Sequence, residues 1–413
     1  MSRESTTVSK IHLDRRQFSA VAAATAATAA SSRALLGQEA TPASEDAGAA
    51  SEVQIEVLAS GLLDPRFVAV DGETIYVTEA GNGGETEVFE VAGQATPAPA
   101  APISMQGYTG RLSSVDADGT VTAIVDDFIS YTFGGNGEIV GAAGVAIADG
   151  KAYVTVGAPG PYVGVMNLTG EEGALYEVDL ATGEKRVVAD LAAYEIENNP
   201  DPVAIDSNLF GVAVRDGIAY VVDAGGNSIL AVDIASGEIS TFAVTGGLEA
   251  PFLPESGNPM RGGEMEIDSV PSGIKVGPDD RLYVSYVTGG PFPPDLAPID
   301  AFMIDGQQET VASGLTMVSD IAFGPDGHLY ACVMSTDMVN GGPGQIVRVM
   351  SDGNHLVVVD GLMLPNGIAF DADGHLLVTN KASFAPEGGG ELLHISGVIE
   401  AAGTPFVVPQ PEA

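Results

Sequence analysis

The chain has 413 residues, of which 45% are hydrophobic and only 6% aromatic, and it contains 53 Gly and 25 Pro. This balance is typical of many short strands joined by turns, and the length is sufficient for a large core. The 16 basic residues against 56 acidic ones give a formal net charge of -40, which makes nucleic acid and anionic lipid poor partners.

The amino terminus combines a twin arginine with a short run of small residues. The arginine pair at 15–16 precedes a Phe and a weakly apolar stretch at 21–30, as in a twin-arginine export signal. That stretch is too short to span a bilayer of about 30 Å, so no membrane insertion is expected. A small-x-small pattern predicts a signal peptide over residues 1–34, followed by a disordered linker over 35–52. The mature chain is therefore expected in the periplasm, at the cell surface or outside the cell.

Six copies of one phrase organise the rest of the chain. Each copy reads apolar-x-apolar, a tight turn and then apolar-Tyr-Val, as in GVAIADGKAYV and GIKVGPDDRLYV. A second pair of strand-like runs follows each copy, so every unit offers four short strands, here called a to d. Four strands in about 40 to 50 residues are typical of one propeller blade. The fold class predicted is all-β, a six-bladed β-propeller with four-stranded antiparallel blades.

Two features of the repeats predict how the ring is held together. A column of large rings is expected to pack between blades; its members are Tyr76, Tyr153, Tyr220, Tyr283 and Tyr330, with Leu377 in the last unit. The sixth unit shows no clear fourth strand, and the amino-terminal segment 53–62 resembles a strand d, so this segment is expected to close the ring. The competing candidate is the segment 404–408. The propeller is predicted over 53–400, with a carboxyl-terminal tail over 401–413.

All the inserted length falls in the loops between strands b and c and between strand d and the next strand a. Because strand direction alternates, these loops share one face of the propeller, where binding is usually built. The starts of the a strands and the ends of the b strands lie at the channel mouth on that face. Their polar members form the candidate ligand-binding site: Arg66, Glu79, Asp223, Tyr286, Asp320, Asn366 and Asn380.

Each candidate also has a plainer interpretation. Asp223 stands beside Gly turns, where an Asp commonly accepts hydrogen bonds from loop amides. Asn366 can be the polar cap of the sixth blade. The single cysteine, Cys332, lies in a strand pattern and is expected to be a buried, inert thiol. None of the five histidines falls on the long-loop face, so a base for Ser-His-Asp hydrolysis is missing there unless a carboxylate such as Glu79 serves.

The chain resembles the ScyD/ScyE family of exported propeller proteins from about Val57 to Ile395. The phrases that carry this resemblance include ENNPDPVAIDSNLFGVAV and VPSGIKVGPDDRLYVSYVTGGPFPP. One departure is Asn-Leu-Phe-Gly at 208–211, where the family often has Asn-Pro-Tyr-Gly. The resemblance implies the propeller fold and export, but no defined reaction.

A wider resemblance is to the gluconolactonase-type propellers, through the Pro-Asn-Gly phrase at 365–367. That resemblance implies a divalent metal at the channel, held by one Glu, two Asn and one Asp. Asn366 matches the phrase, whereas Arg66 stands in the column of the Glu and Asp320 is displaced by one residue. No cofactor is predicted; Ca²⁺ is the ion that such oxygen ligands would prefer.

Two classes of function follow, and whether the protein is an enzyme stays open. The leading hypothesis is a binding or accessory module that presents its long-loop face to a small molecule, glycan or protein. The alternative is a metal-assisted, lactonase-like hydrolase using Asn366, Asp320 and Glu79, and a third possibility is an accessory enzyme of pigment-type biosynthesis.

Overall fold

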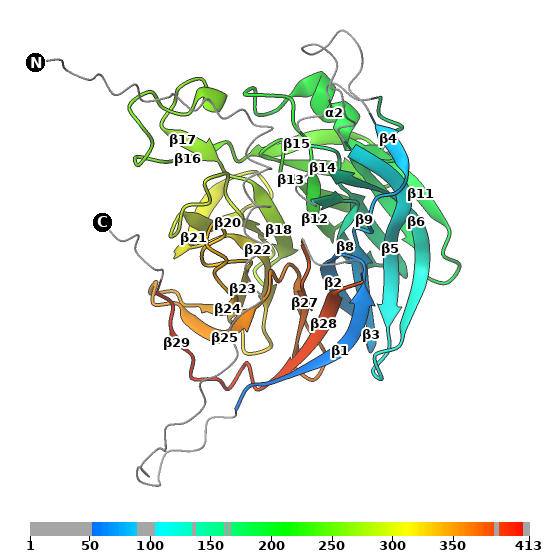
Figure 1. Ribbon diagram of the computed structural model, residues 1–413, viewed down its shortest axis with the longest axis vertical. Coiled ribbons are helices and arrows are strands. Elements are labelled where there is room, and N and C mark those ends of the chain that lie inside the picture. Colours follow the sequence, from blue (N-terminus) through cyan, green and yellow to red (C-terminus); the bar gives the residue numbers. More distant parts are fainter. Residues whose placement is uncertain are drawn as a thin grey trace, which may run out of the picture.

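The six repeated phrases fold into six antiparallel sheets around a common centre (Figure 1). The computed structural model describes residues 52–88, 104–133, 138–160, 163, 167–383 and 388–407. The predicted signal peptide at 1–34 lies outside these residues, as does all but the last residue of the linker predicted over 35–52. The prediction of an all-β, six-bladed propeller with four-stranded blades is confirmed.

The strands follow the chain blade by blade. Blade 1 contains β2 (Pro65–Asp71), β3 (Thr74–Glu79), β5 (Ser104–Val115) and β6 (Val121–Phe133), extended by β4 (Thr86–Val88) and β7 (Ile139–Val140). Blade 2 contains β8 (Ala142–Ala148), β9 (Lys151–Val156), β10 (Ala174–Asp179) and β11 (Lys185–Asp190). Blade 3 contains β12 (Leu209–Arg215), β13 (Ile218–Asp223), β14 (Ser228–Asp233) and β15 (Ile239–Val244).

The second half of the ring has the same plan. Blade 4 contains β18 (Pro271–Val276), β19 (Leu282–Tyr286), β20 (Ala297–Phe302) and β21 (Gln308–Leu315). Blade 5 contains β22 (Val318–Phe323), β23 (Leu329–Val333), β24 (Gly344–Val349) and β25 (Leu356–Leu362), and blade 6 contains β26 (Ile368–Phe370), β27 (Leu376–Asn380), β28 (Gly390–Ser396) and β1 (Gln54–Leu62). The long loops carry α2 (Leu191–Asn198), β16 (Gly247–Glu249), η2 (Pro259–Arg261) and β17 (Glu266–Asp268).

The ring is closed by the amino-terminal strand, as the sequence predicts. β1 pairs with β28 antiparallel, with Ile55 opposite Ile395, and the two strands lie side by side at the bottom of Figure 1. The carboxyl-terminal segment takes a different place. Its short strand β29 (Thr404–Pro405) pairs with β25 and so extends blade 5. Closure at β1 pairs the outer edge of β28 and makes β1 the outermost strand of blade 6.

The tyrosine column packs between blades. All five tyrosines and Leu377 are at most 8% exposed. Tyr283 of blade 4 meets Phe323 of blade 5 edge to face at a centroid distance of 4.9 Å, and Tyr330 meets Phe370 of blade 6 at 5.0 Å. These two rings therefore join their own blades to the next, in the geometry that aromatic pairs prefer.

Hydroxyl groups and glycines bring the innermost strands into close contact. Thr379 Oγ1 donates to the carbonyl of Arg66 in blade 1 at 2.6 Å and accepts from the amide of Gly367 at 2.8 Å. A Cβ at Gly211 would lie 2.7 Å from the carbonyl oxygen of Ser272 in the next blade. Only glycine permits this approach, because a side chain there would overlap the neighbouring backbone.

Candidate functional site

A cavity of about 340 Å³ opens at the channel mouth on the long-loop face. Its wall combines apolar side chains with a smaller number of polar ones, as is usual for small-molecule sites. The apolar side chains are Ile139, Val140, Ala143, Phe210, Ala224, Val270, Val287, Phe292, Met317, Met334 and Met338. The polar side chains are Asp64, Arg66, Glu138, Asp206, Asn208, Asp268, Thr288 and Ser383.

Arg66 is the one predicted site residue that lines this cavity. Its guanidinium group donates to Ser383 Oγ at 3.0 Å, to Asp64 Oδ2 at 3.2 Å and to the carbonyl of Ile139 at 2.7 Å. These bonds tie the start of blade 1 to the loops that enter blade 2 and leave strand β27. The bonds fix the orientation of a buried cation inside a pocket wall.

Asp64 is the partner that gives the cavity its chemistry. It precedes β2 with a backbone φ of 54°, and its Oδ1 has no hydrogen-bond partner within the described part of the chain. Burial raises the pKa of Asp64 to about 7, while the charge of Arg66 acts to lower it and that of Glu138 to raise it. A carboxyl group with a pKa near 7 can both donate and accept a proton at neutral pH.

The long insertion between blades 3 and 4 is anchored beside the cavity by an ion-pair network. Arg261 Nη1 lies 2.7 Å from Asp268 Oδ1 and 3.1 Å from Asp201 Oδ2, and its Nε lies 3.3 Å from Glu266 Oε2. Because Arg261 and Asp201 are both buried, the pairs are only weakly screened by solvent. Asp268 thus contributes to the cavity wall from a fixed position.

Three predicted site residues at the ends of b strands organise loops. Glu79 accepts from the amide of Leu63 at 2.7 Å, and Asn380 Oδ1 accepts from the amide of Met363 at 2.9 Å. Asp223 accepts from the amides of Asn208, Gly225 and Gly226 and from Ser207 Oγ. In each case the side chain receives an amide from the segment that leads into strand a of the same blade. This is the role expected of an Asp beside Gly turns.

The remaining three predicted residues are buried around the channel, outside the cavity wall. Asp320 Oδ1 lies 3.2 Å from Lys275 Nζ, and its Oδ2 accepts from the amide of Ile368 at 3.0 Å. Asn366 Nδ2 donates to the carbonyl of Arg66 at 3.2 Å. Tyr286 belongs to the core at the interface of blades 3 and 4, and burial, together with the charge of Asp300, raises its pKa.

These contacts do not fit a divalent metal of the gluconolactonase type. Glu79 is engaged by an amide and by Ser113 Oγ at 2.7 Å, and the ammonium group of Lys275 already supplies a positive charge beside Asp320. Three oxygens of the predicted set have no hydrogen-bond partner within the described residues: Asn366 Oδ1, the Tyr286 hydroxyl and Asp320 Oδ1, the last of which faces Lys275. A hard cation needs several converging oxygen ligands.

The cavity residues that sequence reasoning missed follow a simple rule. The residue just before each of the first five a strands lines the cavity; these residues are Asp64, Gly141, Asn208, Val270 and Met317. Three of them, Asp64, Val270 and Met317, have a positive φ. The prediction used the starts of the a strands, two residues further along the chain. In blades 1 to 3 these residues are Arg66, Ala143 and Phe210, and all three line the cavity. At Asp64, Val270 and Met317 the positive φ sets the direction of the side chain, which simple alternation along a strand does not predict.

A comparison with protein families finds a match in the second half of the ring. Residues 212–382 match the SMP-30/gluconolactonase/LRE-like region. The chain resembles gluconolactonase-like propellers there. The match runs from β12 in blade 3 to the loop after β27 in blade 6, which is less than half of the chain. Asp64 and Arg66 lie outside it.

Several solved structures are similar to this chain at low identity. A putative gluconolactonase has 11% identity over 83% of this chain and 91% of its own, with a TM-score of 0.47. Virginiamycin B lyase from Staphylococcus aureus has 14% identity over 83% and 99%, with a TM-score of 0.43. A putative oxidoreductase (glucose dehydrogenase) from Thermus thermophilus has 14% identity over 83% and 100%, with a TM-score of 0.46. Similarities this distant carry no conclusion about activity.

A comparison with curated proteins found no matching sequence. Within the described part of the chain, no helix has the length and apolar character needed to cross a membrane.

Proposed function

We propose that this protein is an exported propeller of the ScyD/ScyE type that binds a small molecule in the cavity on its long-loop face. The observation that supports this most is the mixed wall, in which methionine and phenylalanine side chains surround the buried Asp64–Arg66 pair. A cavity of about 340 Å³ is of the size that encloses a small molecule. A glycan or a protein would use a broader surface than this cavity offers.

The charges of the wall favour a neutral or cationic ligand with an apolar body. Four carboxylate residues and one arginine line the cavity, and they sit within a chain whose net charge is -40. The negative potential of these carboxylates would repel an anionic ligand. Methionine side chains adapt to irregular apolar shapes, so Met317, Met334 and Met338 suit the contact with the apolar body.

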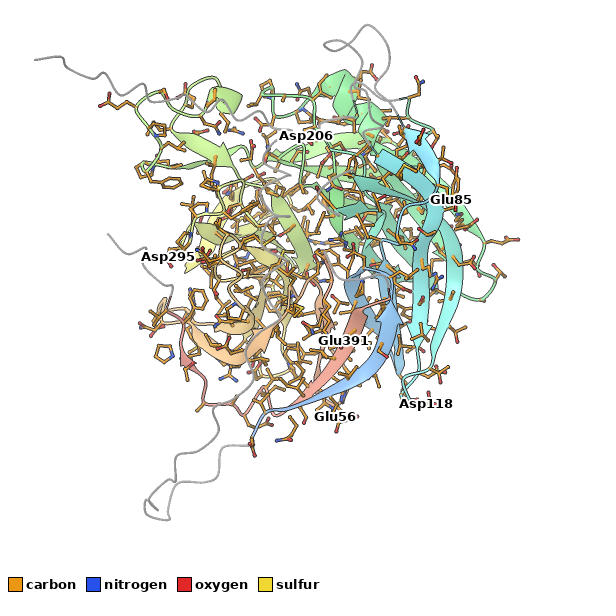
Figure 2. The ribbon with its side chains drawn as sticks, viewed as in Figure 1. Glu56, Glu85, Asp118, Asp206, Asp295 and Glu391 are labelled. Carbon is orange, nitrogen blue, oxygen red and sulfur yellow. The ribbon has the colours of Figure 1, made fainter. Side chains whose placement is uncertain are left out.

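A ligand screen by thermal shift tests this function. The panel contains neutral polyols and lactones, apolar amines and matched carboxylic acids. Hits are expected among the neutral and amine compounds, and Asp64→Asn should weaken them about tenfold or more because a hydrogen-bonding and charged group is changed. Asp118→Asn, an exposed residue in a turn of the opposite face (Figure 2), is the matched control. Binding restricted to acids, or equal affinity in both variants, would refute the proposal.

A lactonase-like hydrolase is the second candidate, and the raised pKa of Asp64 favours it. In its carboxylate form Asp64 takes a proton from water as the water oxygen bonds to the lactone carbonyl. The ring C–O bond then breaks, and the proton passes to the departing oxygen. The assay measures hydrolysis of a panel of lactones through the acid that the reaction releases. Asp64→Asn is expected to reduce the rate by about 100-fold or more, and activity that survives this change would exclude the candidate.

A further inference from the structure

Blade 6 departs from the other five blades at Leu377 and from blades 4 and 5 at Asp371, on the opposite face from the cavity. Five blades have a tyrosine where blade 6 has Leu377. In blades 4 and 5 the residue at the start of the a–b turn is a glycine, and a Cβ there would lie 2.4 Å from the ring of Tyr283 or 2.7 Å from that of Tyr330. Blade 6 has Asp371 at this turn position. The loss of the ring therefore makes room for a carboxylate.

The space beside Leu377 is shared by two histidines. His394 on β28 is the cross-strand partner of Leu377, and its Nε2 lies 3.0 Å from Asp371 Oδ2. His375, at the end of the same a–b turn, has Nδ1 3.5 Å from that oxygen. The two imidazole rings meet edge to face at 4.7 Å. One ligand atom from each of the three residues lies within 4.8 Å of the others.

The carboxylate is oriented for a ligand. Asp371 Oδ1 accepts from the amides of Asp373 at 3.0 Å and His375 at 2.8 Å, which leaves Oδ2 to face the histidines. A ligating carboxylate fixed by backbone amides is a common feature of metal sites.

We propose that Asp371, His375 and His394 bind a divalent transition metal, with zinc as the best match. Two imidazole nitrogens and one carboxylate oxygen form the ligand set of three-residue zinc sites, which leave a fourth position open. Bond lengths of about 2.0–2.2 Å to zinc place ligand atoms roughly 3.3–3.5 Å apart. The present spacing reaches this arrangement with small side-chain rotations. The three side chains are only partly exposed, at 19% for Asp371, 35% for His375 and 28% for His394.

A fourth group lies close by on the closing strand. Glu56 of β1 is paired with His394 across the β1–β28 ladder and lies at the bottom of Figure 2. Paired residues of an antiparallel ladder point to the same side, with Cβ atoms about 4.5–5.5 Å apart. Its carboxylate can complete the coordination or attract the cation. A metal here would tie β28 to the turn between β26 and β27, beside the strand that closes the ring.

Zinc titration of the full chain, without an affinity tag and after removal of metal by a chelator, tests this site. One zinc per chain is expected by calorimetry and by metal analysis after dialysis. His375→Ala and His394→Ala should each weaken binding by about 100-fold or abolish it. His328→Ala is the matched control, because His328 occupies the corresponding turn of blade 5 beside Asp326 and has no second histidine partner among the residues that the structure describes. The melting temperature should rise by about 4 °C with zinc in about 100-fold excess over Kd.

Three results would overturn the proposal. They are the absence of stoichiometric zinc binding, binding that persists in both histidine variants, and equal loss in His328→Ala. Since His375 is a partly exposed turn residue, its variant should fold, and circular dichroism checks this. If His394→Ala is unstable, the comparison of His375→Ala with His328→Ala still decides the question. In the absence of zinc binding, the cluster is an Asp–His hydrogen-bond network only.

Discussion

Glu195 is a buried carboxyl group that this fold holds in its protonated form. It lies on α2 with 0% of its surface exposed, and its Oε2 has no hydrogen-bond partner within the described residues. Burial, and next the charge of Asp223, raises the pKa of Glu195 from 4.5 to about 8. Because the folded pKa is the higher one, the proton stabilises the folded state fully below about pH 4.5, and this contribution is lost as pH rises to about 8.

The magnitude follows from the two pKa values. A change from 4.5 to about 8, at about 1.4 kcal/mol per unit, gives an upper limit of about 5 kcal/mol in the free energy of unfolding. Glu195→Gln keeps the shape of the protonated side chain and removes its titration. The variant should match the wild type at about pH 5 and exceed its stability by several kcal/mol at about pH 8 to 9.

Urea denaturation from about pH 5 to pH 9 measures this effect. The quantity of interest is the difference in unfolding free energy between wild type and Glu195→Gln at each pH, in which other titrating groups such as Asp64 cancel. Glu197→Gln is the control, because Glu197 lies on the same helix and is exposed. A difference that stays constant across this range would show that Glu195 is ionised in the folded protein, contrary to the reasoning.

Two further changes test the packing of the innermost strands. Gly211→Ala should lower the free energy of unfolding by about 2–4 kcal/mol, measured in urea, because its Cβ would lie 2.7 Å from the carbonyl oxygen of Ser272. Thr379→Val should lower the free energy of unfolding by about 1–3 kcal/mol, because the amide of Gly367 loses its acceptor in a buried position. Thr122→Val on the exposed side of β6 controls for the substitution and should cost less than about 0.5 kcal/mol.

The fold was predictable because its physical causes repeat along the chain. A tyrosine that packs between blades, a glycine that admits the next backbone and a tight Asp-Gly turn recur in fixed order, so the blade unit is visible in the sequence. The resemblance of segment 53–62 to a strand d similarly identified the closing strand. Helix α2 was not predicted, since it lies in an insertion that occurs once and has no repeat to define it.

The candidate site was predictable only in part. Strand alternation predicts Arg66 at the start of strand a, where it lines the cavity, but it does not report the positive φ of Asp64, which also lines the cavity. Alternation also does not show which polar side chain is already engaged by a loop amide. Glu79 and Asn380 look like free polar groups in the sequence, and in the fold each accepts the amide that positions its own loop.

In a propeller each position of the blade occurs six times, so a residue in one blade can be compared with its counterparts in the other five. Residues that keep the pattern are explained by packing, and residues that break it need a separate cause. Asp320 stands in a column occupied by glycine in four blades, and its buried carboxyl group is paired with the partly exposed Lys275. Leu377 replaces a tyrosine and stays buried in the core between blades 6 and 1, while the turn position that is a glycine in blades 4 and 5 carries Asp371, 3.0 Å from His394 on the neighbouring strand. For this reason the departure in blade 6 indicates a ligand more strongly than any single histidine would.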